Sequence, residues 1–282
     1  MALDNDWFTE IHAGAGTAFS LKGKKVHEEQ TPFQKIAIYE TETFGNLMII
    51  DDCTMVSDRD NFTYHEMMTH PALYTLDNPT DVLVIGGGDC GTLKEVLKHD
   101  TVNRAVQVEI DERVTRLAEQ YFPDLCSSNN DSRAELLFED AIKWIKEAPA
   151  ESLDLIIVDS TDPIGPAEGL FSKPFYEDCM KALRPGGIVI QQSESPLLHM
   201  HLLKDMHHAM RSANFTDVKT IQFPVVIYPS GWWSATMARK DKNIEGYREK
   251  EAQNKKFETR YYSADMHKAA FVMPVFFKKE LG

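Results

Sequence analysis

Short apolar runs alternate with segments of helical periodicity from Asp81 towards the end of the chain. Runs of this length are typical of strands that are buried on both faces, as in a parallel sheet. Strands are expected near 82–86, 104–109, 134–138, 153–158, 187–192, 217–227 and 233–239, and helices near 92–99, 111–121, 140–147, 173–184 and 198–213. Because strands and helices alternate, the pattern predicts an α/β fold built on a doubly wound parallel sheet.

The part of the chain before Asp81 has a different pattern of apolar and polar residues. Its strand patterns surround a turn that contains Gly45 and cover residues 34–40, 46–51 and 54–57. A helical pattern over 59–74 leads into the second part. We therefore expect an N-terminal β-strand domain with a linking helix over residues 1–75 and a Rossmann-like catalytic domain over residues 76–282. The charged stretch 240–257 is expected to be a solvated helix or loop.

Composition narrows the range of partners. The 282 residues carry 30 basic and 44 acidic side chains, which gives a formal net charge of −14. This charge disfavours nucleic acid or an anionic membrane as a partner and is compatible with a cationic small molecule. No apolar run reaches the roughly 18 residues that a membrane-spanning helix needs, and the first residues lack the layout of a signal peptide. We therefore expect a cytoplasmic protein.

Cysteines and histidines give little sign of a metal site. The cysteines show no zinc-type spacing and are expected to be reduced thiols; they stand at positions 53, 90, 126 and 179. Four histidines cluster later in the chain and are interpreted as an ordinary helix face: His199, His201, His207 and His208. No metal ligand is predicted.

Two carboxylates follow the predicted strand at 153–158. They are Asp159 and Asp162, and the next residues are rich in proline and glycine. Open α/β sheets bind ligands at the carboxyl ends of their strands, so these acids are candidates for a ligand site. The alternative is an ordinary turn with a helix N-cap, because Asp and Pro are common turn residues.

A second candidate site element follows the predicted strand at 82–86. Gly86 to Thr92 satisfies Gly-x-Gly-x-x-Gly between a strand and a helix, and Gly86 and Gly88 would let a ligand approach the backbone. Glu109 ends the next strand, where such folds hold a ribose diol. Asp140 ends the third strand, where an acid commonly binds an adenine amino group. Asp140 is equally suited to cap the helix that follows.

The charge of Asp89, inside this glycine loop, indicates which nucleoside is bound. A dinucleotide would place its pyrophosphate at the loop, where the carboxylate would repel it. S-adenosylmethionine and its relatives carry a sulfonium and an ammonium instead. Neither the glycine loop nor residues 159–169 contains Lys or Arg to neutralise a ligand carboxylate. The sequence therefore favours a cationic nucleoside without a carboxylate.

The chain resembles the spermidine synthases, the polyamine aminopropyltransferases. The resemblance rests on the blocks 64–70, 84–89, 108–111, 159–166, 231–234 and 260–262, and it runs from about residue 30 to residue 274. It implies a Rossmann-like, class I methyltransferase-like sheet with a small N-terminal β domain. Two positions depart from the family pattern, since Cys90 and Ala141 stand where glycine is usual.

The resemblance also implies a reaction, namely transfer of the 3-aminopropyl group from decarboxylated S-adenosylmethionine to putrescine. The expected products are spermidine and 5′-methylthioadenosine. No metal or redox cofactor is expected, because decarboxylated S-adenosylmethionine is a co-substrate with its own leaving group. A homodimer is the expected assembly.

Residue roles follow from the motifs and the resemblance together. Asp159 is the expected general base and Tyr64 orients the amine. Residues 163–170 are expected to form a lid. The nucleoside is expected to contact Gln34, Gly86, Gly88, Asp89, Glu109, Asp140, Ala141 and Pro166. The amine is expected to contact His65, Asp89, Asp159, Asp162, Glu194, Tyr228 and Trp233.

Other functions remain open at this point. A putrescine N-methyltransferase that uses intact S-adenosylmethionine would share the fold, but it needs a basic or amide group for the methionine carboxylate. A nicotinamide dinucleotide dehydrogenase is disfavoured by Asp89, and a non-catalytic nucleoside-binding protein by the complete set of acids. The amine preferred among putrescine, cadaverine, agmatine and spermidine stays open, as does dimer against tetramer.

Overall fold

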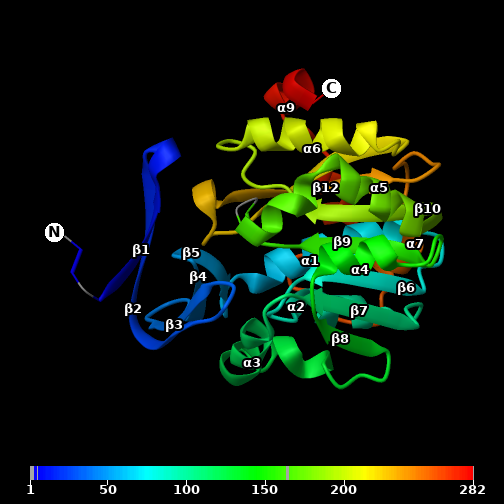
Figure 1. Cartoon of the computed structure of the whole chain (residues 1–282). Coiled ribbons are helices and arrows are strands. Elements are labelled where there is room, and N and C mark those ends of the chain that lie inside the picture. Colours follow the sequence, from blue (N-terminus) through cyan, green and yellow to red (C-terminus); the bar gives the residue numbers. More distant parts are fainter. Residues whose placement is uncertain (1–2, 5, 163–164, 282) are drawn as a thin grey trace.

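The computed structural model describes residues 3–4, 6–162 and 165–281, with two β-sheets at its centre. The smaller sheet is antiparallel and lies to one side of the molecule (Figure 1). Its strands follow one another in chain order: β1 (Trp7–His12), β2 (Thr17–Gln30), β3 (Lys35–Thr41), β4 (Gly45–Ile50) and β5 (Cys53–Ser57). The turn at Gly45 is present as predicted, with a positive φ of 69°.

The larger sheet has seven strands in the order β11-β12-β10-β9-β6-β7-β8. These strands are β6 (Asp81–Gly86), β7 (Arg104–Glu109), β8 (Ala134–Phe138), β9 (Leu153–Asp159), β10 (Leu183–Gln192), β11 (Asp217–Pro224) and β12 (Trp232–Arg239). β6 to β10 run parallel, whereas β12 is antiparallel to both β10 and β11. The expected Rossmann-like sheet is thus confirmed, but it is mixed, since β12 runs against its neighbours.

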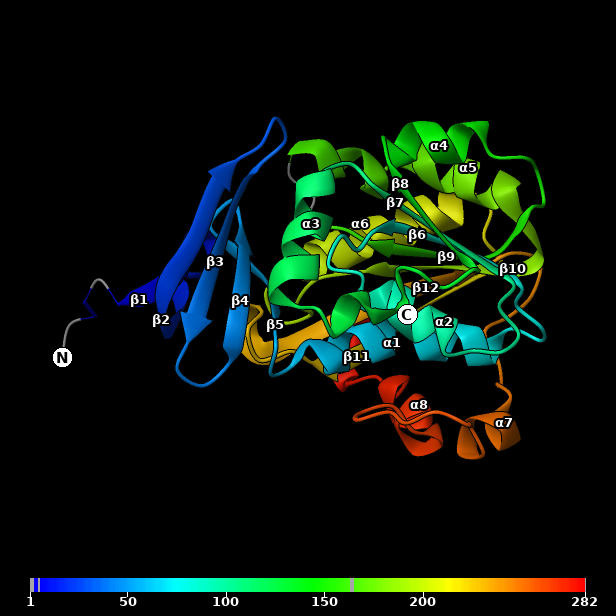
Figure 2. The same ribbon diagram turned by 90° about the horizontal axis from the view of Figure 1, so that it is seen from below.

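Helices cover both faces of this sheet. Successive side chains of each strand point to opposite faces and pack into two different hydrophobic cores. Val82 and Val84 of β6 join the cluster under one layer of helices, and Leu83 and Ile85 join the opposite cluster. Figure 2 shows the two layers on either side of the sheet. The first layer contains α1 (Asn61–Thr75), α2 (Gly91–Leu97), α7 (Glu249–Gln253) and α8 (Ala264–Ala270). The second contains α4 (Ala141–Glu147), α5 (Lys173–Ala182) and α6 (Met200–Ser212).

One helix joins the two sheets. α3 (Glu112–Tyr121) buries Val114, Leu117 and Ala118 against apolar residues of β3 and β4. Its N-cap residue Asp111 accepts a hydrogen bond from the backbone N–H of Arg113. The last helix, α9 (Val275–Leu281), packs on α6. The small sheet is therefore held over the carboxyl ends of β6 and β7, where the site lies.

Sequence-based expectations differ from the structure in a few places. β1 and β2 were not predicted, the strand expected to end at 227 ends at Pro224, and the helix expected to end at 184 ends at Ala182. The stretch 240–257 is less solvated than expected, because Ile244 and Ala252 are buried in the core. Of the helices in the described ranges, none combines the length and apolarity needed to cross a membrane.

Gly86 ends β6 and lies against β9, and this close contact predicts that any side chain at this position would destabilise the fold strongly. Its φ is +77°, and a Cβ would lie 2.3 Å from the carbonyl oxygen of Asp159. Gly231 is a matched control, with φ +68° and nothing within 4 Å of its Cβ position. Gly86→Ala should therefore lower the free energy of unfolding by about 1–3 kcal/mol more than Gly231→Ala. Urea unfolding of both variants measures the difference, and equal losses would contradict the contact.

Candidate active site

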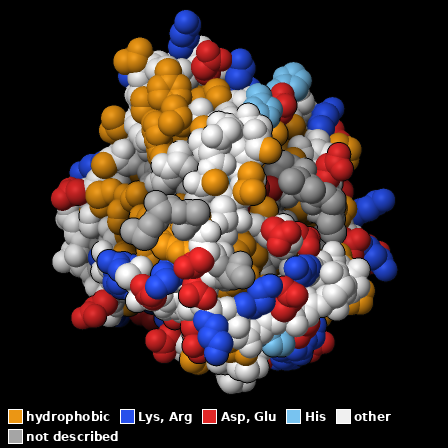
Figure 3. Space-filling model, turned by 90° about the vertical axis from the view of Figure 1, so that its left-hand side faces the viewer, with side chains coloured by type: hydrophobic (Ala, Val, Ile, Leu, Met, Phe, Trp, Pro, Cys, Tyr) orange, Lys and Arg blue, Asp and Glu red, His pale blue; other side chains and the backbone are white. Residues whose placement is uncertain are grey.

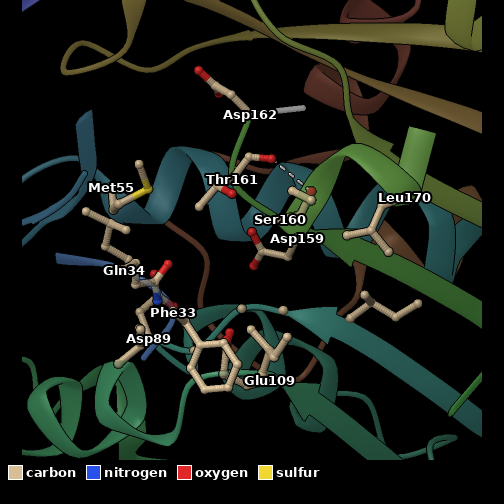
Figure 4. A pocket seen from close by; sticks show the side chains of 18 of the residues that line it. Phe33, Gln34, Met55, Asp89, Glu109, Asp159, Ser160, Thr161, Asp162 and Leu170 are labelled. Carbon is tan, nitrogen blue, oxygen red and sulfur yellow. Dashed lines mark hydrogen bonds between the residues drawn. The ribbon is translucent and has the colours of Figure 1, made fainter. Parts of the chain in front are cut away.

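A cavity of about 310 Å³ lies between the small sheet and the carboxyl ends of β6, β7 and β9. Figure 4 shows Asp159 in the middle of this cavity, Asp162 above it and Glu109 below it. Eleven of the predicted site residues line it: Gln34, Tyr64, Gly86, Gly88, Asp89, Glu109, Asp140, Ala141, Asp159, Asp162 and Tyr228. The sheet topology thus brings together residues that lie far apart in the sequence, as ligand sites of open α/β sheets require.

Other predicted residues lie outside the described lining of this cavity. His65, Glu194 and Trp233 are buried behind it, with 3%, 1% and 3% of their surface exposed. Pro166 belongs to the 3₁₀ helix η3 (Gly165–Phe171), but its side chain is not among those described. The expected lid over 163–170 includes residues 163–164, which lie outside the described residues.

Asp159 is held from two sides. Tyr64 donates its hydroxyl to Oδ1 at 2.7 Å, and Thr92 donates its hydroxyl to Oδ2 at 2.6 Å. Burial, followed by the nearby charge of Asp89, raises the pKa of this carboxyl above its usual value. A carboxylate with fixed orientation and a raised pKa has the properties of a general base.

Asp89 forms a buried ion pair with His65. Asp89 Oδ1 accepts a hydrogen bond from the backbone N–H of Gly91 at 2.7 Å, and Oδ2 lies 3.2 Å from His65 Nε2. Burial acts to lower the pKa of His65, but the charge of Asp89, its hydrogen bond and the charges of neighbouring carboxylates together raise that pKa. Burial acts to raise the pKa of Asp89, but the charge and hydrogen bond of His65, together with the N–H of Gly91, lower that pKa. His65 therefore supports Asp89 from behind and does not itself line the cavity.

The nucleoside end of the cavity contains Glu109, Gln34 and Asp140. Burial raises the pKa of Glu109 to about 7. Its Oε1 accepts a hydrogen bond from the backbone N–H of Asp111 at 2.9 Å. Gln34 precedes β3 and does not lie in a strand, and its side-chain nitrogen donates to Asp111. Asp140 is confirmed as a helix N-cap, since Oδ1 accepts from the N–H of Ile142 and Lys143 and the residue also lines the cavity.

The opposite end of the cavity is an acid cluster. Burial, then the charge of Glu194 and a hydrogen bond to it, raises the pKa of Asp162 to about 8. Burial also raises the pKa of Glu194 and of Glu10, which lies on β1 and accepts hydrogen bonds from Thr54. Acids whose pKa is raised in this way can release their protons when a cation binds beside them.

Two residues of this cluster were not predicted to belong to it. Glu10 was missed because β1 itself was missed; the sequence signal was its position two residues from Phe8, on the same buried face. His199 was interpreted as part of an ordinary helix face, but its Nδ1 lies 2.9 Å from Glu194 Oε2. His207, by contrast, is buried and bonds Thr220 at 2.8 Å.

Aromatic rings form the wall next to Asp159. The ring of Tyr228 packs edge-on against Tyr64 at 5.7 Å between centroids, and its hydroxyl donates to the backbone oxygen of Met55. Trp233 lies behind Tyr228 at 4.7 Å. The expectation that Trp233 lines the amine channel is therefore corrected, because its ring supports Tyr228. In the part of the chain that the structure describes, no group of three or more His, Cys, Asp or Glu is arranged to hold a metal ion.

Comparison with known families covers both parts of the chain. The family model "Spermine/spermidine synthase domain" matches residues 61–248, and the model "Spermidine synthase tetramerisation domain" matches residues 6–57. The chain belongs to the spermine/spermidine synthase family. It is 62% identical to the polyamine aminopropyltransferase of Thioalkalivibrio sulfidiphilus, with 100% of this chain and 99% of the relative covered. It is also 62% identical to the enzyme of the same name from Methylococcus capsulatus, covering 96% of this chain and 95% of that one.

Solved structures of this family have the same fold. A spermidine synthase in complex with the transition-state analogue AdoDATO matches with a TM-score of 0.95 and 32% identity, covering 100% of this chain and 97% of that one. The spermidine synthase from Thermotoga maritima matches with a TM-score of 0.92 and 33% identity, covering 98% and 94%. The family resemblance and the fold predicted from the sequence are both confirmed.

Proposed function

We propose that this chain is a polyamine aminopropyltransferase of the spermidine synthase type. It transfers the 3-aminopropyl group of decarboxylated S-adenosylmethionine to putrescine and yields spermidine and 5′-methylthioadenosine. The observation that carries the proposal is a buried, oriented Asp159 with a raised pKa between a nucleoside end and an acid cluster. The names and identities of the relatives support the same reaction.

The chemistry asks two things of the protein, which are positioning and deprotonation. Putrescine is a dication near neutral pH, since amines of this kind have pKa values of about 10.4. Asp159 takes a proton from the attacking ammonium, and Tyr64 keeps the carboxylate in line. The freed nitrogen attacks the aminopropyl carbon bonded to sulfur. The carbon–sulfur bond breaks, and its electron pair returns to sulfur, which becomes the neutral thioether of methylthioadenosine.

The remaining polar groups bind the two substrates. We propose that Glu109 accepts the ribose hydroxyls, that Asp140 and Ala141 contact the adenine, and that Asp89 binds the ammonium of the aminopropyl arm. Asp162 lines the cavity and binds the distal ammonium of the diamine, and Glu194 and Glu10 attract that ammonium from behind Asp162. None of these steps uses a metal or redox cofactor, so we propose that a chelator leaves turnover unchanged.

A putrescine N-methyltransferase is not favoured. Intact S-adenosylmethionine brings a carboxylate on the carbon that carries its ammonium, beside the place proposed for Asp89. Among the cavity-lining residues that the structure describes, none is Lys or Arg. His65, which lies next to Asp89, is already paired with that carboxylate.

Diamine affinity should depend on pH through Asp162. Its pKa of about 8 means that it is mostly neutral at pH 7 and mostly ionised at pH 9. The diamine remains protonated over this range, so its affinity should rise by up to about tenfold between these values. Calorimetry at several pH values measures this. In the Asp162→Asn variant, diamine affinity should change little with pH. A pH dependence as steep as that of the wild type would show that another group causes it.

The assembly and location are further proposals. Apolar side chains gather on the face that carries the small sheet (Figure 3), and Ile11 of β1 is 73% exposed. An exposed apolar patch of this kind is typical of a contact between subunits. We propose an oligomer formed through this sheet, with the homodimer as its unit, and a cytoplasmic location in which the four free cysteines stay reduced. Light scattering after size-exclusion chromatography measures the subunit number.

The function is tested by identifying products. Purified protein is incubated with decarboxylated S-adenosylmethionine and, in separate reactions, putrescine, cadaverine, agmatine or spermidine. Mass spectrometry should show spermidine and methylthioadenosine with putrescine, in equal amounts. Absence of an aminopropylated product with every amine would overturn the proposal.

A further inference from the structure

Two thiols meet beside the glycine loop. Cys90 directly follows Asp89, and its Sγ donates to the carbonyl oxygen of Gly88 at 3.6 Å. Cys126 lies in the 3₁₀ helix η2 (Leu125–Ser128), and its Sγ donates to the carbonyl oxygen of Asp89 at 3.7 Å. The two carbonyls belong to consecutive residues of the glycine loop. η2 packs on α2, which Cys90 caps, and the two thiols hydrogen-bond each other.

The surroundings of Cys90 are unusual for a buried cysteine. Its φ is +68°, a conformation that favours glycine, so a side chain here is retained at a cost. The side-chain nitrogen of Gln107 donates to the sulfur at 3.6 Å, and the Gln107 side-chain oxygen has no hydrogen-bond partner among the described residues. The Asn129 side chain, whose nitrogen donates to Glu119 at 3.2 Å, also lies close enough to lower the pKa of the Cys90 thiol.

These hydrogen-bond donors lower the pKa at which the two thiols together lose their first proton. The hydrogen bond from Cys126, helped by the two amides, lowers the pKa of Cys90 in spite of burial. The hydrogen bond to Cys90, followed by burial, raises the pKa of Cys126. The pair therefore loses one proton more easily than an ordinary thiol and shares the other. The remaining cysteines differ, since burial raises the pKa of Cys53 to about 12 and Cys179 is fully buried with a raised pKa.

We propose that Cys90 and Cys126 are a redox site, which a hydroperoxide converts to a disulfide that weakens nucleoside binding. Cys126 is the partly exposed member and reacts first. As the shared proton moves to Cys90, the Cys126 sulfur attacks one peroxide oxygen. The O–O bond breaks, and hydroxide leaves and takes up the proton that the pair had lost. The Cys90 sulfur then attacks the Cys126 sulfenic acid, the S–O bond breaks, and the Cys90 proton leaves with it as water.

The disulfide acts on the cavity wall. Forming it draws the two sulfurs to about 2 Å and removes both S–H donors, so the carbonyls of Gly88 and Asp89 lose these hydrogen bonds. Both residues line the cavity, and a shift of about 1 Å in a positioning wall can cost about a hundredfold in rate. Reductant restores the thiols. An effect of the disulfide on turnover rests on the function proposed above. Disulfide formation and nucleoside binding can be measured even if the protein catalyses a different reaction.

The test uses the full chain. Protein is treated with hydrogen peroxide, quenched with catalase, alkylated and digested for mass spectrometry. We expect a peptide that joins Cys90 to Cys126, affinity for methylthioadenosine lowered by at least about tenfold in calorimetry, and recovery with dithiothreitol. Cys126→Ser should form no disulfide and keep its affinity after peroxide, because a serine hydroxyl still donates to Asp89. The Cys53→Ser variant should form the same disulfide and lose affinity after peroxide as the wild type does, when its oxidised form is compared with its own reduced form.

Two results would overturn the proposal. One is oxidation of the protein with no Cys90–Cys126 peptide. The other is a disulfide that leaves methylthioadenosine affinity unchanged. A disulfide that weakens nucleoside binding in a protein that transfers no aminopropyl group would sustain the redox site and refute only the proposed reaction.

Discussion

Asp159→Asn is expected to lower turnover by about 100- to 10,000-fold, the usual cost of losing a general base. The amide keeps the shape of the side chain but cannot take the proton from the attacking ammonium. Only one of its two terminal atoms can still accept a hydrogen bond, although Tyr64 and Thr92 both donate to the carboxylate. Methylthioadenosine should still bind, because the nucleoside end of the cavity depends on Glu109. Steady-state kinetics with calorimetry of product binding measures both effects.

Asp154→Asn is the matched control, since Asp154 lies near the opposite end of the same strand. Its carboxylate pairs with Arg184 at 2.8 Å, far along β9 from the cavity. Its loss should affect stability and leave the turnover of folded protein near that of the wild type. Near-normal turnover in Asp159→Asn, with normal product binding, would show that another group removes the proton.

Decarboxylated S-adenosylmethionine should bind about tenfold to a hundredfold more tightly than the intact molecule. The extra carboxylate would lie close to Asp89, in a cavity that also contains Asp159 and Asp162. Two unit charges about 4 Å apart interact by about 4 kcal/mol at an effective dielectric constant of about 20. His65 offsets part of this repulsion, because it carries the positive charge of the ion pair. Competition titration of the two nucleosides measures the preference.

Asp89→Asn should reduce that preference and weaken the decarboxylated nucleoside itself. A charge-assisted hydrogen bond contributes roughly 1.5–3 kcal/mol, so the loss should be about tenfold to a hundredfold in affinity. Methylthioadenosine lacks the ammonium and should bind almost as before. Asn can still accept from the N–H of Gly91, which keeps the loop in place. Equal weakening of both ligands would mean that Asp89 shapes the loop and does not bind the ammonium.

The larger sheet could be predicted because its strands are buried on both faces. Runs such as 82–86 and 153–158 are apolar, with Asp154 as the exception, and are followed by glycine or acid; the structure places them as β6 and β9. The acids that end these strands meet in one cavity for the same topological reason. The first strands of the small sheet were harder to predict, since β2 is largely polar and half-exposed along its length and carries no clear alternation.

Contacts between distant segments were beyond sequence reasoning. Nothing in the sequence near Glu10 indicates that β1 brings it close to Asp162. The pairing of Cys90 with Cys126 depends on how η2 packs on α2. Trp233 was assigned to the cavity from its motif, but the alternation of β12 turns it into the core behind Tyr228. Periodicity specifies which face of an element is buried and not which element covers it.

One competition reaction tests whether this acid-lined cavity selects an aminopropyl donor. Equal concentrations of decarboxylated and intact S-adenosylmethionine are mixed with putrescine and the enzyme, and the products are identified by mass. We expect spermidine and methylthioadenosine, with intact S-adenosylmethionine left unconsumed. N-methylputrescine together with S-adenosylhomocysteine as the main products would contradict this expectation.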